Sequence, residues 1–214
     1  MTMDRNKLKL TLILLLVTVP ISLATWVYYA NFNSDAFGST SKGTLVIPVI
    51  DITELQLKDV DDKPAYLSFE AMTAAVTPQQ YKPRPWQLLY LGSENCDVTC
   101  QQRLYFLRQL HVRLGGEAAR VQRVYVLAID GDEQVDAATR DYLQDQQADM
   151  RILRGKLATV ANALRRSPET DPIDGHYIYL MDPVGNIMLY FTPALDAEAI
   201  LKDLKKLLDS SSIG

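Results

Sequence analysis

Hydrophobic and polar positions follow alternating strand-like and helix-like patterns over most of the chain. Two short, continuous apolar runs, residues 86–91 and 121–129, are typical of buried strands. Between them, a helix is predicted from about residue 97 to residue 114, because leucines recur there at helical spacing. These leucines are Leu104, Leu107, Leu110 and Leu114. Gly115 and Gly116 end the predicted helix.

The same alternation continues towards the C-terminus. The next predicted elements are a helix, a strand, a helix and two strands, at residues 135–147, 150–153, 156–166, 176–181 and 187–191. Asp196 then caps an amphipathic helix with an apolar side formed by Ile200, Leu201, Leu204, Leu207 and Leu208. This order predicts an α/β fold, with a central mixed sheet and helices on both of its faces.

The N-terminal segment is apolar on all sides, unlike the rest of the chain. No charged residue occurs between Leu10 and Ser34. As a helix, residues 10–30 would span about 30 Å, the thickness of the hydrocarbon core of a bilayer. Basic residues precede the segment, at Arg5, Lys7 and Lys9, and aromatic residues stand at its far end, at Trp26, Tyr28 and Tyr29. We therefore expect one transmembrane helix, with residues 1–9 in the cytoplasm and the remainder exported.

A cleaved signal peptide is the alternative, with Ser22-Leu23-Ala24 as its small-residue cleavage site. Cleavage there would leave an aromatic stretch near the new terminus, which is more typical of a membrane-interface anchor. Both interpretations place the following residues outside the cytoplasm, in the periplasm if the source is a bacterium. Residues 31–43 are predicted to be a tether, residues 44–85 an N-terminal β extension and loop, and residues 86–210 the main domain.

Composition narrows the range of functions. The net charge is −4 and no basic stripe is present, so we expect no nucleic-acid partner. The chain has two cysteines and two histidines, and their spacing does not match a classical four-ligand zinc site. Any chemistry based on soft or imidazole ligands therefore depends on very few residues.

Cys96 and Cys100 fall between the first buried strand and the helix that follows it. Amide groups at a helix N-terminus favour an anion, so a thiolate there is stabilised. If both cysteines lie in the first helical turn, their Cβ atoms are about 5–6 Å apart. That distance permits a shared soft metal ion and, with adjustment, a disulfide. A purely structural disulfide is the alternative, but so short a loop removes little entropy from the unfolded chain.

Three other side chains are candidates for this site. His176 is predicted at the start of a strand, at the end of the sheet that faces the cysteine loop, and two thiolates with one imidazole suit copper. The alternative is a histidine that caps the strand or faces solvent. His111 lies in the middle of a predicted helix and is interpreted as a surface or packing residue. Asp130 ends the second buried strand, where it could tune the thiols, contact a partner or cap the following loop.

The cysteine region and the C-terminal strands resemble the SCO/SenC proteins. The resemblance is carried by residues 86–130 and by the run HYIYLMDPVGNIMLYF, and it covers roughly residues 86–209. The family motif is a C-x-x-x-C pair with a distant histidine before a Pro-x-Gly turn, matched here by Cys96, Cys100, His176, Pro183 and Gly185. The resemblance implies a thioredoxin-like fold, a single N-terminal anchor and work on the copper-binding subunit of cytochrome c oxidase.

Two functions remain open from this resemblance. In the first, Cys96, Cys100 and His176 bind copper, as Cu(I) or Cu(II), and transfer it to the oxidase subunit or to another assembly factor. In the second, the chain is a thiol–disulfide oxidoreductase in which Cys96 attacks and Cys100 resolves.

One local sequence feature favours metal binding, and others favour the thiol reaction. Oxidoreductases of this fold normally carry a cis-proline opposite the cysteines, and Gly175-His176 at that place favours metal binding. Asp97 and Gln101 replace the prolines that the SCO/SenC family often has after each cysteine, and the histidine-to-turn spacing is about two residues shorter. These departures favour the thiol reaction.

Overall fold

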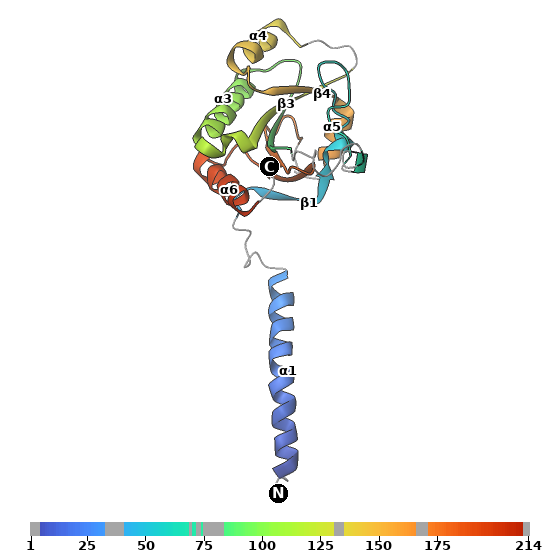
Figure 1. Ribbon diagram of the computed structural model, residues 1–214, viewed down its shortest axis with the longest axis vertical. Coiled ribbons are helices and arrows are strands. Elements are labelled where there is room, and N and C mark those ends of the chain that lie inside the picture. Colours follow the sequence, from blue (N-terminus) through green and yellow to red (C-terminus); the bar gives the residue numbers. More distant parts are fainter. Residues whose placement is uncertain are drawn as a thin grey trace. The chain divides into compact units, whose positions relative to one another are not determined.

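The computed structural model describes residues 5–32, 41–68, 70–71, 74, 84–130, 135–165 and 171–211. By its internal contacts the chain divides into two units, Met1–Ser41 and Lys42–Gly214. The described part of the first unit contains helix α1, Arg5–Phe32, which includes the segment predicted to span a membrane (Figure 1). A search of the described residues finds no helix with both the length and the apolar character needed to cross a membrane.

Six strands of the second unit form one mixed sheet in the order β1-β6-β5-β2-β3-β4. Their bounds are β1 Thr44–Asp51, β2 Trp86–Gly92, β3 Val121–Ile129, β4 Arg151–Lys156, β5 Ile178–Met181 and β6 Asn186–Phe191. Strands β2, β3 and β4 are parallel, whereas β5, β6 and β1 pair antiparallel to their neighbours. The mixed sheet is therefore as predicted, and β1 extends it beyond β6.

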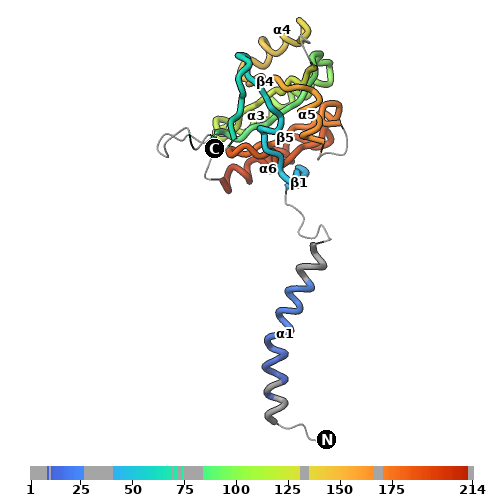
Figure 2. The backbone as a smooth tube through the Cα atoms, turned by 90° about the vertical axis from the view of Figure 1, so that its right-hand side faces the viewer, coloured from blue at the N-terminus to red at the C-terminus, as the bar shows by residue number. Residues whose placement is uncertain are grey.

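Helices cover both faces of this sheet, as predicted (Figures 1 and 2). One face packs against α3 (Val98–Arg113), α4 (Ala137–Gln146) and α6 (Ala197–Ser210). The other packs against α5 (Leu157–Leu164) and the short 3-10 helix η2 (Ile52–Leu55). A second 3-10 helix, η3 (Gly115–Arg120), joins α3 to β3 and was not predicted.

Burial and capping explain why these segments are helical. The four leucines predicted to form the apolar stripe of α3 are all buried. Asp97, Asp136 and Asp196 are the N-caps of α3, α4 and α6, and each accepts a hydrogen bond from the backbone N–H three residues later. Such a bond satisfies one of the amide donors that a helix N-terminus otherwise leaves unpaired.

The β5–β6 hairpin is confirmed, but its first strand starts later than predicted. Asp182 Oδ1 accepts from the backbone N–H groups of Val184, Gly185 and Asn186 at 3.0, 2.7 and 2.8 Å, which fixes the turn. His176, predicted to begin the strand, lies instead at the end of a turn with a φ of 48°. Its backbone N–H donates to the Ile173 carbonyl at 3.1 Å, so it is engaged in the turn and not in the sheet ladder.

Candidate functional site

Cys96 and Cys100 are joined by a disulfide at the start of α3, with their Cα atoms 5.2 Å apart. Cys96 lies just before the helix, because the N-cap of α3 is Asp97, so the arrangement with both cysteines in the first helical turn does not occur. The Cys96 N–H donates instead to Thr139 Oγ1 of α4 at 2.8 Å. Both cysteines are nearly buried, with 3% and 5% of their surface exposed. The loop after β2 therefore holds the sulfur pair against α4 and the sheet.

The N-terminus of α3 is already occupied by a carboxylate. Asp97 Oδ1 accepts the Cys100 N–H at 2.9 Å, so this amide is not free to stabilise a thiolate. The exposed Asp97 side chain also brings negative charge to the helix end that otherwise favours an anion. The predicted thiolate stabilisation by this helix end is thus reduced by the residue that starts the helix.

A tyrosine from the neighbouring strand reaches the sulfur pair. Tyr125 of β3 places its hydroxyl oxygen 3.9 Å from Cys100 Sγ and 3.4 Å from the Ser93 carbonyl oxygen. Burial is the main cause that raises the pKa of Tyr125 above 10.0, and nearby Tyr90 and Glu94 raise it further. The hydroxyl therefore keeps its proton at neutral pH and is a hydrogen-bond donor.

Gly92 makes room for this hydroxyl. A Cβ atom built on Gly92 would lie 2.0 Å from the Tyr125 hydroxyl oxygen, closer than real Cβ contacts allow. Any other residue at the end of β2 would therefore displace the tyrosine. The position of the Tyr125 hydroxyl beside the sulfur therefore depends on a glycine at residue 92.

His176 is held from two sides at the same end of the sheet. The Tyr90 hydroxyl and His176 Nδ1 are 2.8 Å apart, and the two rings are nearly parallel with centroids 6.3 Å apart. Arg103 Nε of α3 donates to the His176 carbonyl oxygen at 3.0 Å. The Tyr90 and Tyr125 rings are 6.1 Å apart. His176 is thus connected to the sulfur pair through two tyrosines.

Arg103 is a buried cation beside this network. It is 8% exposed, its guanidinium lies 4.9 Å from the Phe106 ring centroid, and burial lowers its pKa. Its Nη2 is buried without a hydrogen-bond partner among the described atoms. Sequence reasoning missed Arg103, Tyr90 and Tyr125. A signal existed for Arg103, because its position three residues after Cys100 places it on the same helical face.

The predicted metal ligands come together only in part. Cys96 and Cys100 are joined and His176 lies at the same end of the sheet. However, no group of three or more His, Cys, Asp or Glu side chains is arranged to hold a metal ion in the part of the chain that the structure describes. Two reduced sulfurs at this spacing fit Cu(I), which prefers thiolates, whereas the disulfide offers none. A bond from His176 Nδ1 to the ion would require its contact with Tyr90 to break.

His111 and Asp130 are the remaining candidates. His111 was predicted to be a surface or packing residue; it is half-buried, with its Nε2 3.0 Å from the Ala118 carbonyl oxygen and 2.7 Å from that of Val121, which favours packing. Asp130 is exposed at the end of β3.

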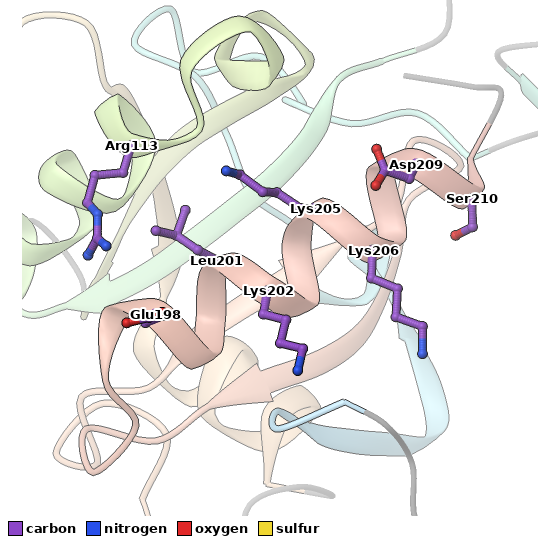
Figure 3. Close-up of a pocket in the computed structure, with 8 residues that line it drawn as sticks. All are labelled: Arg113, Glu198, Leu201, Lys202, Lys205, Lys206, Asp209 and Ser210. Carbon is purple, nitrogen blue, oxygen red and sulfur yellow. The ribbon is translucent and has the colours of Figure 1, made fainter.

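An open hollow lies away from the cysteines, between the C-terminal end of α3 and α6 (Figure 3). Its lining residues are Arg113, Glu198, Leu201, Lys202, Lys205, Lys206, Asp209 and Ser210. Arg113 and Cys100 stand near opposite ends of α3, about 20 Å apart at the rise of an α-helix. The hollow is therefore separate from the sulfur pair.

The mixed sheet, the helices on both faces and the cysteine pair at the start of α3 define a thioredoxin-like protein. A family model described as "Transmembrane-like, thioredoxin-like, C-terminal domain" matches residues 86–211, and the chain belongs to this family. A search of the curated proteins found no significant match.

Several solved structures share the fold. Copper-bound yeast Sco1 is 18% identical, with a TM-score of 0.53 over 76% of this chain and 92% of that one. BsSco, described as a member of the Sco family of cytochrome c oxidase assembly proteins, is 13% identical, with a TM-score of 0.53 over 77% and 96%. Apo Sco1 from Thermus thermophilus is 17% identical, with a TM-score of 0.50 over 78% and 96%. The predicted resemblance to SCO/SenC proteins is confirmed as a likeness of fold.

Proposed function

We propose that this chain is a membrane-anchored, extracytoplasmic assembly factor for cytochrome c oxidase that binds copper through Cys96 and Cys100. The observation that carries this proposal is the close approach of two buried sulfurs, at the same end of the sheet as His176. Two thiolates at this spacing select Cu(I) over harder ions. The fold shared with copper-bound yeast Sco1 and with BsSco supports the proposal.

Copper is the cargo in this proposal. The reduced sulfurs of Cys96 and Cys100 hold the ion, and His176 supplies a third donor once it leaves Tyr90. The copper-binding subunit of the oxidase, or another assembly factor, receives the ion by replacing these ligands one at a time. Such an exchange moves no electrons, so Cu(I) is received in the oxidation state in which it was bound.

A Cu(I) titration tests this function. The full chain in detergent, fully reduced, would be titrated against a competing chelator, together with His176→Ala and, as the matched control, His111→Ala. We expect one-to-one binding that is weakened about tenfold or more in His176→Ala and unchanged in His111→Ala. Equal affinity in both variants would remove His176 as a ligand. A reduced wild-type chain that fails to compete for Cu(I) would contradict the copper function itself.

Thiol–disulfide exchange is the second candidate, and the disulfide itself is the observation that favours it. An exchange protein passes two electrons to or from a partner through a mixed disulfide. A chain that does not bind Cu(I) but forms such a mixed disulfide with an exported protein would be assigned this function.

Membrane anchoring by α1 is the part of the proposal that rests on the N-terminal segment. Its large apolar side chains are exposed, including Leu16 at 77% and Ile21 at 62%, and exposed apolar surface of this kind requires cover. In a bacterial host, we expect the full chain to stay in membranes through a carbonate wash. Leu15→Arg with Leu16→Arg should release it, because each arginine costs about 3 kcal/mol at the centre of a spanning helix.

Val112→Arg is the matched control, since Val112 is an exposed apolar residue of α3. This variant should stay in the membrane fraction like the wild type. Recovery of the wild-type chain in the soluble fraction would refute the anchor.

A further inference from the structure

We propose that the Tyr125 hydroxyl is a catalytic group for opening the Cys96–Cys100 disulfide. It donates a hydrogen bond to the Cys100 sulfur, which makes Cys100 the leaving sulfur and Cys96 the sulfur that is attacked. This inference rests on the proposed function in one respect, which is that the cysteine pair must convert between the disulfide and the dithiol. Copper binding requires the dithiol, and thiol exchange uses both forms.

The two sulfurs have different surroundings. The Tyr125 hydroxyl oxygen is 3.9 Å from Cys100 Sγ, and a disulfide sulfur carries no hydrogen, so the tyrosine is the donor. Cys96, by contrast, forms its described hydrogen bonds through its backbone, donating to Thr139 and accepting from Gln101. Only the Cys100 sulfur is thus seen beside a hydroxyl donor in the described residues.

The hydroxyl has one proton and two acceptors within reach. In the disulfide form it is also 3.4 Å from the Ser93 carbonyl oxygen, a long contact for an O–H donor. A thiolate on Cys100 would be a stronger acceptor, because hydrogen bonds to charged groups are stronger than those to neutral ones. Tyr125 is fully buried, and the space for its hydroxyl exists because residue 92 is glycine. The donor is therefore in place before the sulfur becomes charged.

The reductant in this step is a dithiol. One of its thiolates attacks Cys96 Sγ and forms a new S–S bond there. The Cys96–Cys100 bond breaks, and its electron pair goes to Cys100 Sγ, which the Tyr125 O–H then stabilises. The second thiolate of the reductant attacks the mixed disulfide, so the dithiol leaves as a disulfide and Cys96 leaves as a thiolate. The protein gains two electrons, and the reductant loses two.

A leaving thiolate that is better stabilised departs faster. The oxidised full chain in detergent would be treated with dithiothreitol under native conditions, and free thiols would be counted by alkylation and mass spectrometry over time. We expect Tyr125→Phe to be reduced roughly 3- to 10-fold more slowly than wild type, because one hydrogen bond to a full charge is worth about tenfold or more and the leaving sulfur carries only part of its charge in the transition state. In strong denaturant, the two chains should be reduced at the same rate.

Tyr179→Phe is the matched control. It also removes a buried tyrosine hydroxyl, one without a described hydrogen-bond partner, and Tyr179 packs in the core on the opposite face of the sheet. This variant should be reduced at the wild-type rate. Equal or faster reduction of Tyr125→Phe would overturn the proposal, as would equal slowing in both variants.

A monothiol identifies the attacked sulfur. With glutathione, we expect peptide mapping to find the mixed disulfide on Cys96 in the wild type, and a mixed disulfide mainly on Cys100 would overturn the assignment. A wild-type chain that dithiothreitol reduces only in denaturant would contradict the proposed function as well, since its cysteines would not be available as a dithiol. If the wild-type chain is reduced under native conditions and Tyr125→Phe is reduced at the same rate, the role of Tyr125 is overturned but the proposed function is not.

Discussion

Replacing Cys96 or Cys100 with serine is expected to lower the Cu(I) affinity of the reduced chain by at least about a hundredfold. Loss of a residue that only supports a metal ligand already costs about 10- to 100-fold in affinity. A serine hydroxyl is a hard, protonated donor, so each variant would leave a single soft ligand in the pair. The measurement is a competitive titration of each variant with a Cu(I) chelator.

The oxidised wild-type chain is the matched control for these variants. Its sequence is unchanged, but both sulfurs are bonded to each other, so it should bind Cu(I) as weakly as the serine variants. The fold should survive both substitutions, because a disulfide that closes so short a loop contributes little to stability. A serine variant that is folded and binds Cu(I) as tightly as the wild type would exclude the sulfur pair as the copper site.

The two serine variants also separate the candidate functions. Copper binding needs both sulfurs, so it predicts similar losses of Cu(I) affinity in Cys96→Ser and Cys100→Ser. Thiol exchange with Cys96 as the attacked sulfur predicts an asymmetry instead. Cys100→Ser would accumulate a mixed disulfide with its partner, whereas Cys96→Ser would not. If both serine variants lose Cu(I) affinity equally and only Cys100→Ser accumulates the mixed disulfide, one site performs both reactions.

Local patterns predicted the elements but not all of their ends. Helix α3 was predicted well because its leucines recur at helical spacing and are buried in one core. The start of α3 was predicted correctly, because Asp97, a typical N-cap residue, begins the helix directly after Cys96. His176 was placed in a strand because the turn before β5, which includes Gly175, was not recognised.

The surroundings of the sulfur pair could not be predicted in the same way. Tyr90 and Tyr125 stand in apolar runs and look like ordinary strand residues in the sequence. They become neighbours because β2 and β3 pair in parallel with these two residues in register. Arg103 meets the His176 carbonyl across 73 positions of the chain. Strand register and such long-range contacts depend on the whole fold, and local periodicity carries no information about them.

Raising the pH above about 10 is expected to unfold the domain cooperatively. Burial raises the pKa of four tyrosines above 10.0, to about 12 for Tyr66 and further for Tyr90, Tyr125 and Tyr179. Between pH 10 and these higher values, the unfolded chain has released protons that the folded chain still holds. Stability is therefore fully present below pH 10 and is lost as the pH rises.

The size of this effect follows from proton linkage. Each such tyrosine removes about 1.4 kcal/mol of stability per pH unit above 10, so four together remove about 5 to 6 kcal/mol per unit. Because domains of this size are stable by only about 5–15 kcal/mol, we expect the midpoint of unfolding between about pH 11 and 13. Circular dichroism and tyrosinate absorbance, followed against pH, should change together.

Single tyrosine variants test the cause. Tyr179→Phe should make the loss of stability about a quarter less steep and move the midpoint to higher pH, because one of the four hydroxyls no longer titrates. Tyr105→Phe is the matched control, since Tyr105 is 59% exposed on α3. Two results would show that burial of these hydroxyls does not determine the pH at which the domain unfolds. One is the same shift of the midpoint in both variants, and the other is tyrosinate absorbance that rises well before the fold is lost.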